Sequence, residues 1–151
     1  MRRSLIVAAV MAVGFAVVAN AQGWGEPARG SATRAAFMDA IRPHAEWQLG
    51  APVEFVVHDL RVAGDVGFAS LYAQRPGGGV IDIRKTPMFM RGEIDPEIMD
   101  GATLQALYRK SGATWVAVHW AIGATDVWWA YGPICREYWA VINDACVGIS
   151  D

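Results

Sequence analysis

The stretch TLQALYRKSGATWVAVHWAI, residues 103–122, decides the fold of this chain. Two segments in which apolar residues recur at every second position flank Ser111 and Gly112, and a short turn between such segments is typical of a β-hairpin. We therefore predict strands at Thr103–Lys110 and Ala113–Ile122. In the second strand we predict that the core face carries Val116, Val118, Trp120 and Ile122, and that the other face carries Trp115, Ala117, His119 and Ala121.

The same period of two continues upstream of the hairpin. Val53–Val62 is rich in β-branched residues, and both of its faces are largely apolar, which predicts a central strand. Strict alternation places Val53, Phe55 and Val57 on one face and Val56, His58, Leu60 and Val62 on the other. A turn precedes a second strand at Val66–Gln74, and Val80–Ile83 could extend the sheet at an edge.

Helical patterns lie at the two ends of the domain. Ser31 or Thr33 can cap an N-terminal helix that carries Phe37, Ala40, Ile41 and His44 at helical spacing and stops at Gly50. Pro43 either kinks this helix or begins a second one. A short terminal helix is predicted from Cys135 to Ile142.

The two cysteines, Cys135 and Cys146, are predicted to form a disulfide. No Cys-x-x-Cys motif or histidine cluster accompanies them, so a metal site is not predicted. In one unbroken helix their α-carbons would lie roughly 16 Å apart, which is too far to bridge. The helix must therefore end between them and the chain must fold back.

The N-terminus predicts where the protein works. A basic start at Arg2 and Arg3, an apolar run over residues 5–18 and the small residues Ala19 and Ala21 are typical of a secretory signal peptide. We predict a signal peptide at 1–21, a flexible leader at 22–30 and a single domain at 31–151. Because no cysteine follows the cleavage site, no lipid anchor is expected, and the mature chain should be periplasmic or secreted without a stable membrane anchor.

Composition limits the classes of partner. The net charge of −2 becomes −4 once Arg2 and Arg3 are removed with the signal peptide, and no basic patch invites a nucleic acid. Seven Trp, four Tyr and five Phe are many for a small domain, and they supply either a dense core or a ligand groove.

Together these elements predict an α+β fold: an N-terminal helix packed on a curved, mostly antiparallel meander sheet of about four to five strands, and a short C-terminal helix with a disulfide. This order, with the closing hairpin of Gln105–Lys110 and Trp115–Val118, resembles the cystatin-like and NTF2-like folds, in which a curved sheet wraps one or more helices. The segments Asp100–Ala102 and Ile122–Trp129, with the two late cysteines, also resemble small exported bacterial proteins. The resemblance implies a shape and a compartment.

The segment 123–133 is the first candidate site. Its large rings, between glycines on a connection, can form a stacking platform for a sugar or a peptide, with Asp126 as a hydrogen-bond acceptor. The candidate ligand-binding residues are Asp126, Trp128, Trp129 and Tyr131. In the alternative, Trp128 and Trp129 cover the open end of the sheet and Asp126 only fastens the turn.

Histidines supply the second candidate site. His119 could act as a base oriented by Asp126, and His58 is a further candidate for proton transfer. The favoured hypothesis is a binding domain for a small ligand, an envelope polymer or a protein partner, with an NTF2-like pocket enzyme that uses His58, His119 or Asp126 as the alternative. No motif predicts a cofactor.

Overall fold

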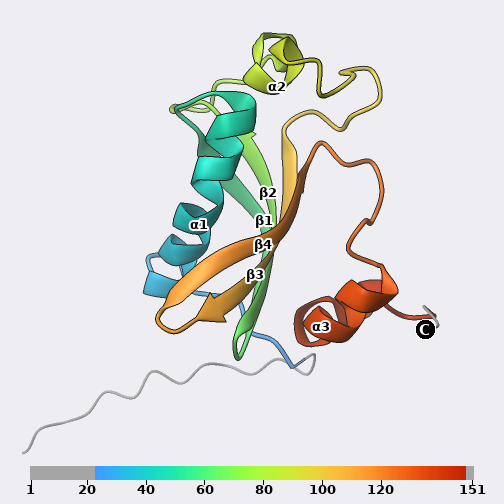
Figure 1. Cartoon of the computed structure of the whole chain (residues 1–151). Coiled ribbons are helices and arrows are strands. Elements are labelled where there is room, and N and C mark those ends of the chain that lie inside the picture. Colours follow the sequence, from blue (N-terminus) through green and yellow to red (C-terminus); the bar gives the residue numbers. More distant parts are fainter. Residues whose placement is uncertain (1–22, 149–151) are drawn as a thin grey trace, which may run out of the picture.

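The computed structural model describes residues 23–148 (Figure 1). The predicted signal peptide and its cleavage site before Gln22 lie outside the described residues. The elements in chain order are α1 (Ala32–Leu49), β1 (Glu54–Ala63), β2 (Val66–Gln74), the 3₁₀ helix η1 (Ile83–Lys85), α2 (Pro87–Met90), β3 (Thr103–Ser111), β4 (Thr114–Ile122), α3 (Gly132–Ile142) and the 3₁₀ helix η2 (Asn143–Ala145).

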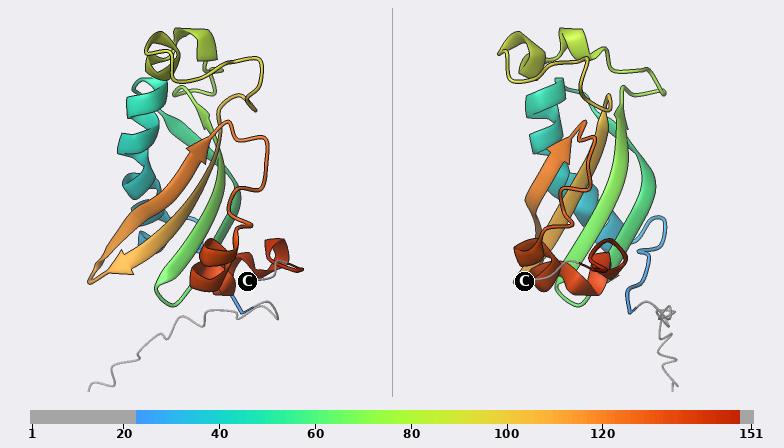
Figure 2. Two further views of the ribbon diagram at one scale, coloured as in Figure 1. Left: turned by 45° about the vertical axis from the view of Figure 1, so that its right-hand side comes forward. Right: turned by 90° about the vertical axis from the view of Figure 1, so that its right-hand side faces the viewer.

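The four strands of the described chain form one antiparallel sheet in the order β1-β2-β3-β4, so each strand pairs with its neighbour in sequence. The sheet is curved around α1, which crosses one face, and α3 lies against the opposite face (Figures 1 and 2). With the disulfide described below, this arrangement confirms the predicted α+β meander and its two helices.

α1 owes its position to an apolar stripe. Ser31 caps the helix, because its Oγ accepts a hydrogen bond from the Arg34 amide at 3.2 Å. The four inward positions recur every four residues and are fully buried: Phe37, Ile41, Ala45 and Leu49. Pro43 lies inside this single helix, so no second helix begins there.

The face of the sheet under α1 is closely packed. Phe37 stacks on Tyr108 of β3 with ring centroids 4.2 Å apart, and it meets Trp115 of β4 edge-on at 4.8 Å. Gly67 of β2 makes room for this ring, since a Cβ at that position would lie 2.2 Å from Phe37 Cζ. The helix therefore fills the hollow of the sheet.

α3 covers part of the opposite face. Its Tyr138, Val141 and Ile142 are fully buried in a second core cluster with Phe68 and Leu107 of the sheet. The chain turns back through η2, which brings the α-carbons of the two cysteines to 5.8 Å and confirms the predicted Cys135–Cys146 disulfide. This bond indicates that the protein folds in an oxidising environment.

Two predictions about the sheet are wrong. β1 is an edge strand: β2 is its strand partner, and on its other side the described chain provides an isolated bridge from Gly25 to Val62. Val80–Ile83 adds no strand and leads into η1. Apolar residues on both faces indicated a central strand, but here the apolar residues that face α1 pack in the core, whereas Val56 on the other face is 41% exposed.

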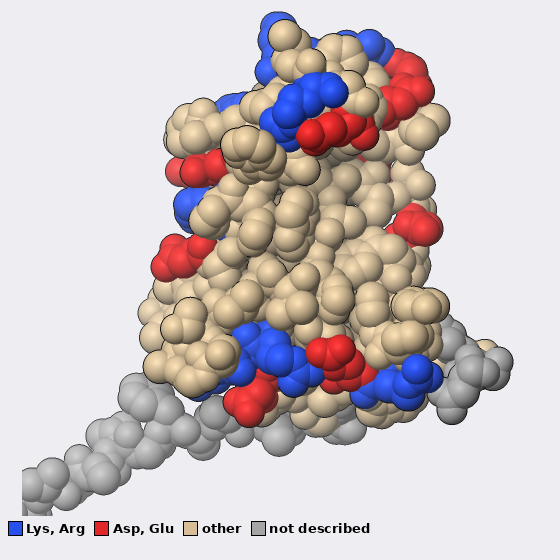
Figure 3. Space-filling model, in the orientation of Figure 1, with Lys and Arg blue, Asp and Glu red and all other residues tan. Residues whose placement is uncertain are grey.

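β4 forms the other edge of the sheet. In Figure 3, charged side chains gather near α2 and near α3, and the centre of the view, over β4, is uncharged.

No helix in the described part of the chain, residues 23–148, is long and apolar enough to cross a membrane.

Candidate functional site

A β-bulge at His58 determines which side chains of β1 face α3. The pairing with β2 shifts between Val57 and Asp59, so His58 has no partner. One extra residue exchanges the two faces of a strand for all residues beyond it. Leu60 therefore packs in the core under α1, whereas Asp59 and Arg61 point to the opposite face.

A second β-bulge lies at the other edge of the sheet. The pairing of β3 with β4 shifts there, so Val118 of β4 has no partner on β3. These two bulges overturn the predicted strand faces. In β1, Leu60 and Val62 share the α1 core with Phe55 and Val57. In β4, Trp115 and Ala117 share it with Trp120 and Ile122. Val116 and Val118 are each 44% exposed, so they do not form the predicted core face.

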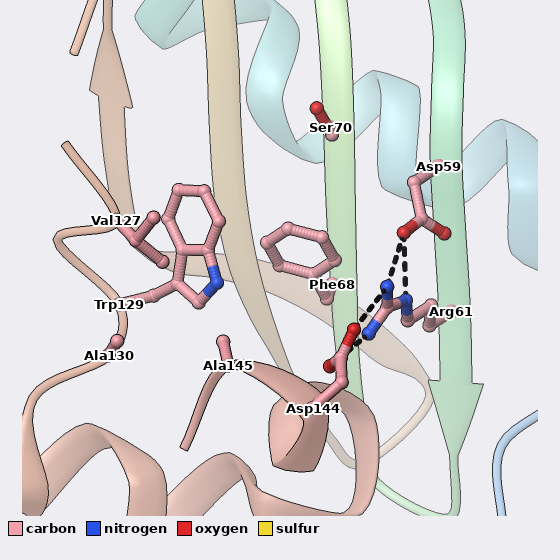
Figure 4. Close-up of a pocket in the computed structure, with 9 residues that line it drawn as sticks. All are labelled: Asp59, Arg61, Phe68, Ser70, Val127, Trp129, Ala130, Asp144 and Ala145. Carbon is pink, nitrogen blue, oxygen red and sulfur yellow. Dashed lines mark hydrogen bonds and ion pairs between the residues drawn. The ribbon is translucent and has the colours of Figure 1, made fainter. Parts of the chain in front are cut away.

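A cavity of about 440 Å³ lies between the α3 side of the sheet and the connection from β4 to α3, residues 123–131 (Figure 4). Its floor is formed by two neighbouring cross-strand pairs, Asp59 with Ser70 and Arg61 with Phe68. The full lining is Asp59, Arg61, Phe68, Ser70, Val127, Trp129, Ala130, Asp144 and Ala145. The cavity thus has an aromatic and aliphatic side formed with the connection and a charged side formed by β1 and η2.

Arg61 ties the sheet to the C-terminal segment. Its Nη1 and Nη2 donate to the two carboxylate oxygens of Asp144 at 2.7 and 3.0 Å, and Nη1 also donates to the Val141 carbonyl at 3.0 Å. Its Nε donates to Asp59 at 2.8 Å. The guanidinium also lies over the rings of Trp24 and Phe68, with its carbon 4.7 and 5.4 Å from their centroids.

These contacts set the charge states on the polar side of the cavity. Burial disfavours the charged form of Arg61, but the hydrogen bonds to Asp144 and Asp59 outweigh it, so the pKa of Arg61 is raised. The hydrogen bonds from Arg61 lower the pKa of Asp144 despite some burial. The cation is therefore held between two carboxylates, and its hydrogen bonds favour the ionised form of Asp144.

The predicted aromatic residues differ in their placement. Trp129 lines the cavity and tilts against Phe68, with ring centroids 5.3 Å apart. Trp128 meets Trp129 edge-on at 5.6 Å and packs against the second core cluster, but it does not line the cavity. Tyr131 is 61% exposed and Asp126 is exposed, and neither lines the cavity. The structure thus places one of the four candidate residues in the cavity.

The proton-transfer candidates are not brought together. His58 is exposed on β1, and His119 lies on β4 with its ring edge-on to Tyr138 of α3 at 5.8 Å. Because β1 and β4 are separated by two strands, strand spacing alone puts them roughly 14 Å apart. Within the described residues no hydrogen bond or ion pair joins His119 to Asp126.

Sequence reasoning missed most of the cavity. The missed residues that carry its chemistry are Asp59, Arg61, Phe68, Ser70 and Asp144. One signal was available, because Asp59 and Arg61 place opposite charges at alternate positions of an otherwise largely apolar strand. In residues 23–148 no group of three or more His, Cys, Asp or Glu side chains could hold a metal ion.

No protein-family model matches the chain, and neither a curated protein nor a solved structure does.

Proposed function

We propose that this protein is an exported binding module, not an enzyme, and that it holds a small ligand in the cavity beside Trp129. The observation that carries the proposal is the lining, in which one tryptophan face meets two carboxylates across about 440 Å³. Small-molecule sites are typically cavities of roughly 300–1,000 Å³ with apolar and aromatic walls and a few placed polar groups. The cavity fits that description in size and in chemistry.

The charged wall of the cavity is also tethered at two points. The disulfide fixes α3 to Cys146, which directly follows η2, and the ion pair of Arg61 with Asp144 fixes η2 to β1. A site that is rigid before binding loses less conformational entropy when a ligand enters. This rigidity supports a cavity that binds a ligand, in preference to the alternative in which the connection at residues 123–131 only covers the sheet.

The alternative function, a pocket enzyme, receives less support. An NTF2-like pocket needs an open hollow in the sheet, and here α1 fills that hollow with Phe37, Ile41, Ala45 and Leu49. His58, His119 and Asp126 do not line the cavity, which further favours binding over proton transfer.

The proposed location is the periplasm or the exterior. Residues 1–21 have the pattern of a signal peptide, and the disulfide fits an oxidising compartment. The helix α1, wrapped by a meander sheet, supports a relation to the cystatin-like folds.

An envelope polymer or a protein partner is an alternative occupant of the cavity, which the experiment below would identify.

The two adjacent tryptophans offer a matched pair of variants. Wild-type protein purified from the envelope without reductant would be incubated with a whole envelope extract, and retained molecules would be identified by mass spectrometry. We expect Trp129→Ala to lose the retained molecule and Trp128→Ala to keep it, because Trp129 alone of the two lines the cavity. Melting curves of both variants report the loss of stability separately from the loss of binding.

The proposal fails if the wild-type protein retains nothing, or if folded Trp129→Ala retains the molecule as well as wild type does. Retention of an envelope polymer or a protein in a Trp129-dependent manner would keep the site and change the class of occupant.

A further inference from the structure

The polar groups that face the cavity differ in what they can still bind. Arg61 has no nitrogen left over, because Nε, Nη1 and Nη2 all contact the carboxylates of Asp59 and Asp144 and Nη1 also donates to Val141. Trp24 and Phe68 lie near the guanidinium as well. An anion entering the cavity would therefore find no free donor on the cation.

Asp59, in contrast, keeps acceptor capacity, because within residues 23–148 no group donates to its Oδ1. An ionised carboxylate accepts about four hydrogen bonds, so lone pairs remain on Asp59. The Asp144 carboxylate interacts with Arg61 and with the backbone amides of Asp144 and Ala145, and it offers a ligand its exposed negative charge. Ser70 adds a hydroxyl beside Asp59.

The charge that is exposed to the cavity is negative, because the two carboxylates are more exposed than the guanidinium. The side chain of Arg61 is 13% exposed, whereas those of Asp59 and Asp144 are 32% and 54% exposed. The three charges sum to −1, and the part that solvent or a ligand can reach is negative. Trp129, the aromatic face opposite this charge, is the ring type that best attracts a cation.

From this geometry we infer, resting on the proposed function, that the ligand is an organic ammonium: a positively charged amine with an apolar or aromatic body. The ammonium group donates to Asp59 and is attracted by the exposed charge of Asp144, and the body lies against Trp129 and Val127. Figure 4 shows these two sets of side chains on opposite sides of the cavity.

A charge series with a constant body tests this inference. Phenethylammonium, phenethyl alcohol and phenylpropionate share a phenyl ring and a two-carbon spacer and differ in charge, and maltotriose serves as a neutral polyol. Each would be titrated by calorimetry into the wild-type protein. We expect the ammonium to bind about tenfold or more tightly than the alcohol, and the carboxylate to bind more weakly than the alcohol.

Two variants locate the effect. Asp144→Asn keeps the shape of the side chain and removes its charge, so it should reduce the preference for ammonium over alcohol by about threefold to tenfold. Glu137→Gln removes a carboxylate of α3 that pairs with Arg109 and does not line the cavity, so it should leave the preference unchanged. If Asp144→Asn folds poorly, the charge series on the wild-type protein still tests the inference.

The outcomes separate the inference from the proposed function. If the alcohol, the carboxylate or maltotriose binds at the cavity as tightly as the ammonium, or if the molecule retained from envelope extract lacks an amine, the inference is overturned and the binding function stands. If no probe binds and no extract molecule is retained through Trp129, both fail.

Discussion

The two faces of the sheet are covered by helices of different kinds. α1 is an 18-residue helix that presses a continuous apolar stripe into the hollow of the sheet. α3 has 11 residues, follows a long connection, and is held by a disulfide and by a hydrogen bond from Arg61 to the Val141 carbonyl. A long apolar helix excludes space, whereas a short tethered helix leaves space beside it. We therefore assign stability mainly to the α1 face and propose that the α3 face is the binding face.

Leu60→Asp should have the largest effect, because Leu60 is fully buried in the core under α1. The substitution would place a carboxylate among apolar side chains, without a cation partner. Burying such an unpaired charge costs several kcal/mol, comparable with the roughly 5–15 kcal/mol that stabilises a whole domain. Circular dichroism should show no cooperative melting.

The matched control is His58→Asp, which adds the same carboxylate to β1 outside the core. His58 is exposed, so this substitution should change the free energy of unfolding by no more than about 0.5 kcal/mol. A Leu60→Asp variant that melts within a few degrees of wild type would contradict the placement of Leu60 in the core under α1.

Phe37→Ala should have the next largest effect and tests the packing of the α1 face. Loss of a fully buried ring costs about 3–5 kcal/mol, measured by denaturant unfolding. Gly67→Ala should cost about 1–3 kcal/mol by overpacking, since its Cβ would collide with Phe37. The double variant should lose less stability than the sum of the two, because removing the ring makes room for the new methyl group. Additive losses of stability would contradict the contact between position 67 and the Phe37 ring.

Cys146→Ser tests the tether of the α3 face. Opening the loop closed by the disulfide should cost roughly 3 kcal/mol in the chain-entropy model. Thermal melting with and without reductant provides the measurement, and reductant should destabilise wild type but not the variant. Equal melting temperatures for oxidised wild type and variant would mean that the tether does not stabilise the fold.

The smallest effect concerns Asp144. Its folded pKa is lowered, so the stability it contributes is present above its unfolded pKa and is lost as pH falls through the folded value. Because half of the side chain is exposed, that contribution should be at most about 1 kcal/mol. Denaturant unfolding should find Asp144→Asn less stable than wild type at neutral pH, with the difference shrinking below about pH 4. A difference that stays constant with pH would contradict the ion pair.

The sequence predicted the parts of the fold that depend on local pattern. The hairpin at residues 103–122, the bounds of β2, the Ser31 cap and the disulfide all follow from periodicity, capping chemistry or the two cysteines. The candidate segment at 123–133 also contained Trp129, which lines the cavity. Each of these features can be inferred from residues close in sequence.

The rest of the site could not be predicted in the same way. A bulge adds a residue without a distinctive residue type, so strict alternation misplaced Leu60 and Val62 and hid the direction of Asp59 and Arg61. The pairing of Arg61 with Asp144 joins residues 83 positions apart. Such a contact depends on where α3 docks on the sheet, which no local pattern specifies.

The most direct test of the central claim is an amide NMR titration of ¹⁵N-labelled protein with phenethylammonium. If the α3 face is the binding face, the perturbed signals should cluster at Asp59, Ser70, Trp129 and Ala130, which line the cavity. The signals of α1 from Phe37 to Leu49 should stay in place. Perturbations that follow α1, or spectra that do not change, would contradict the assignment of stability to one face of the sheet and binding to the other.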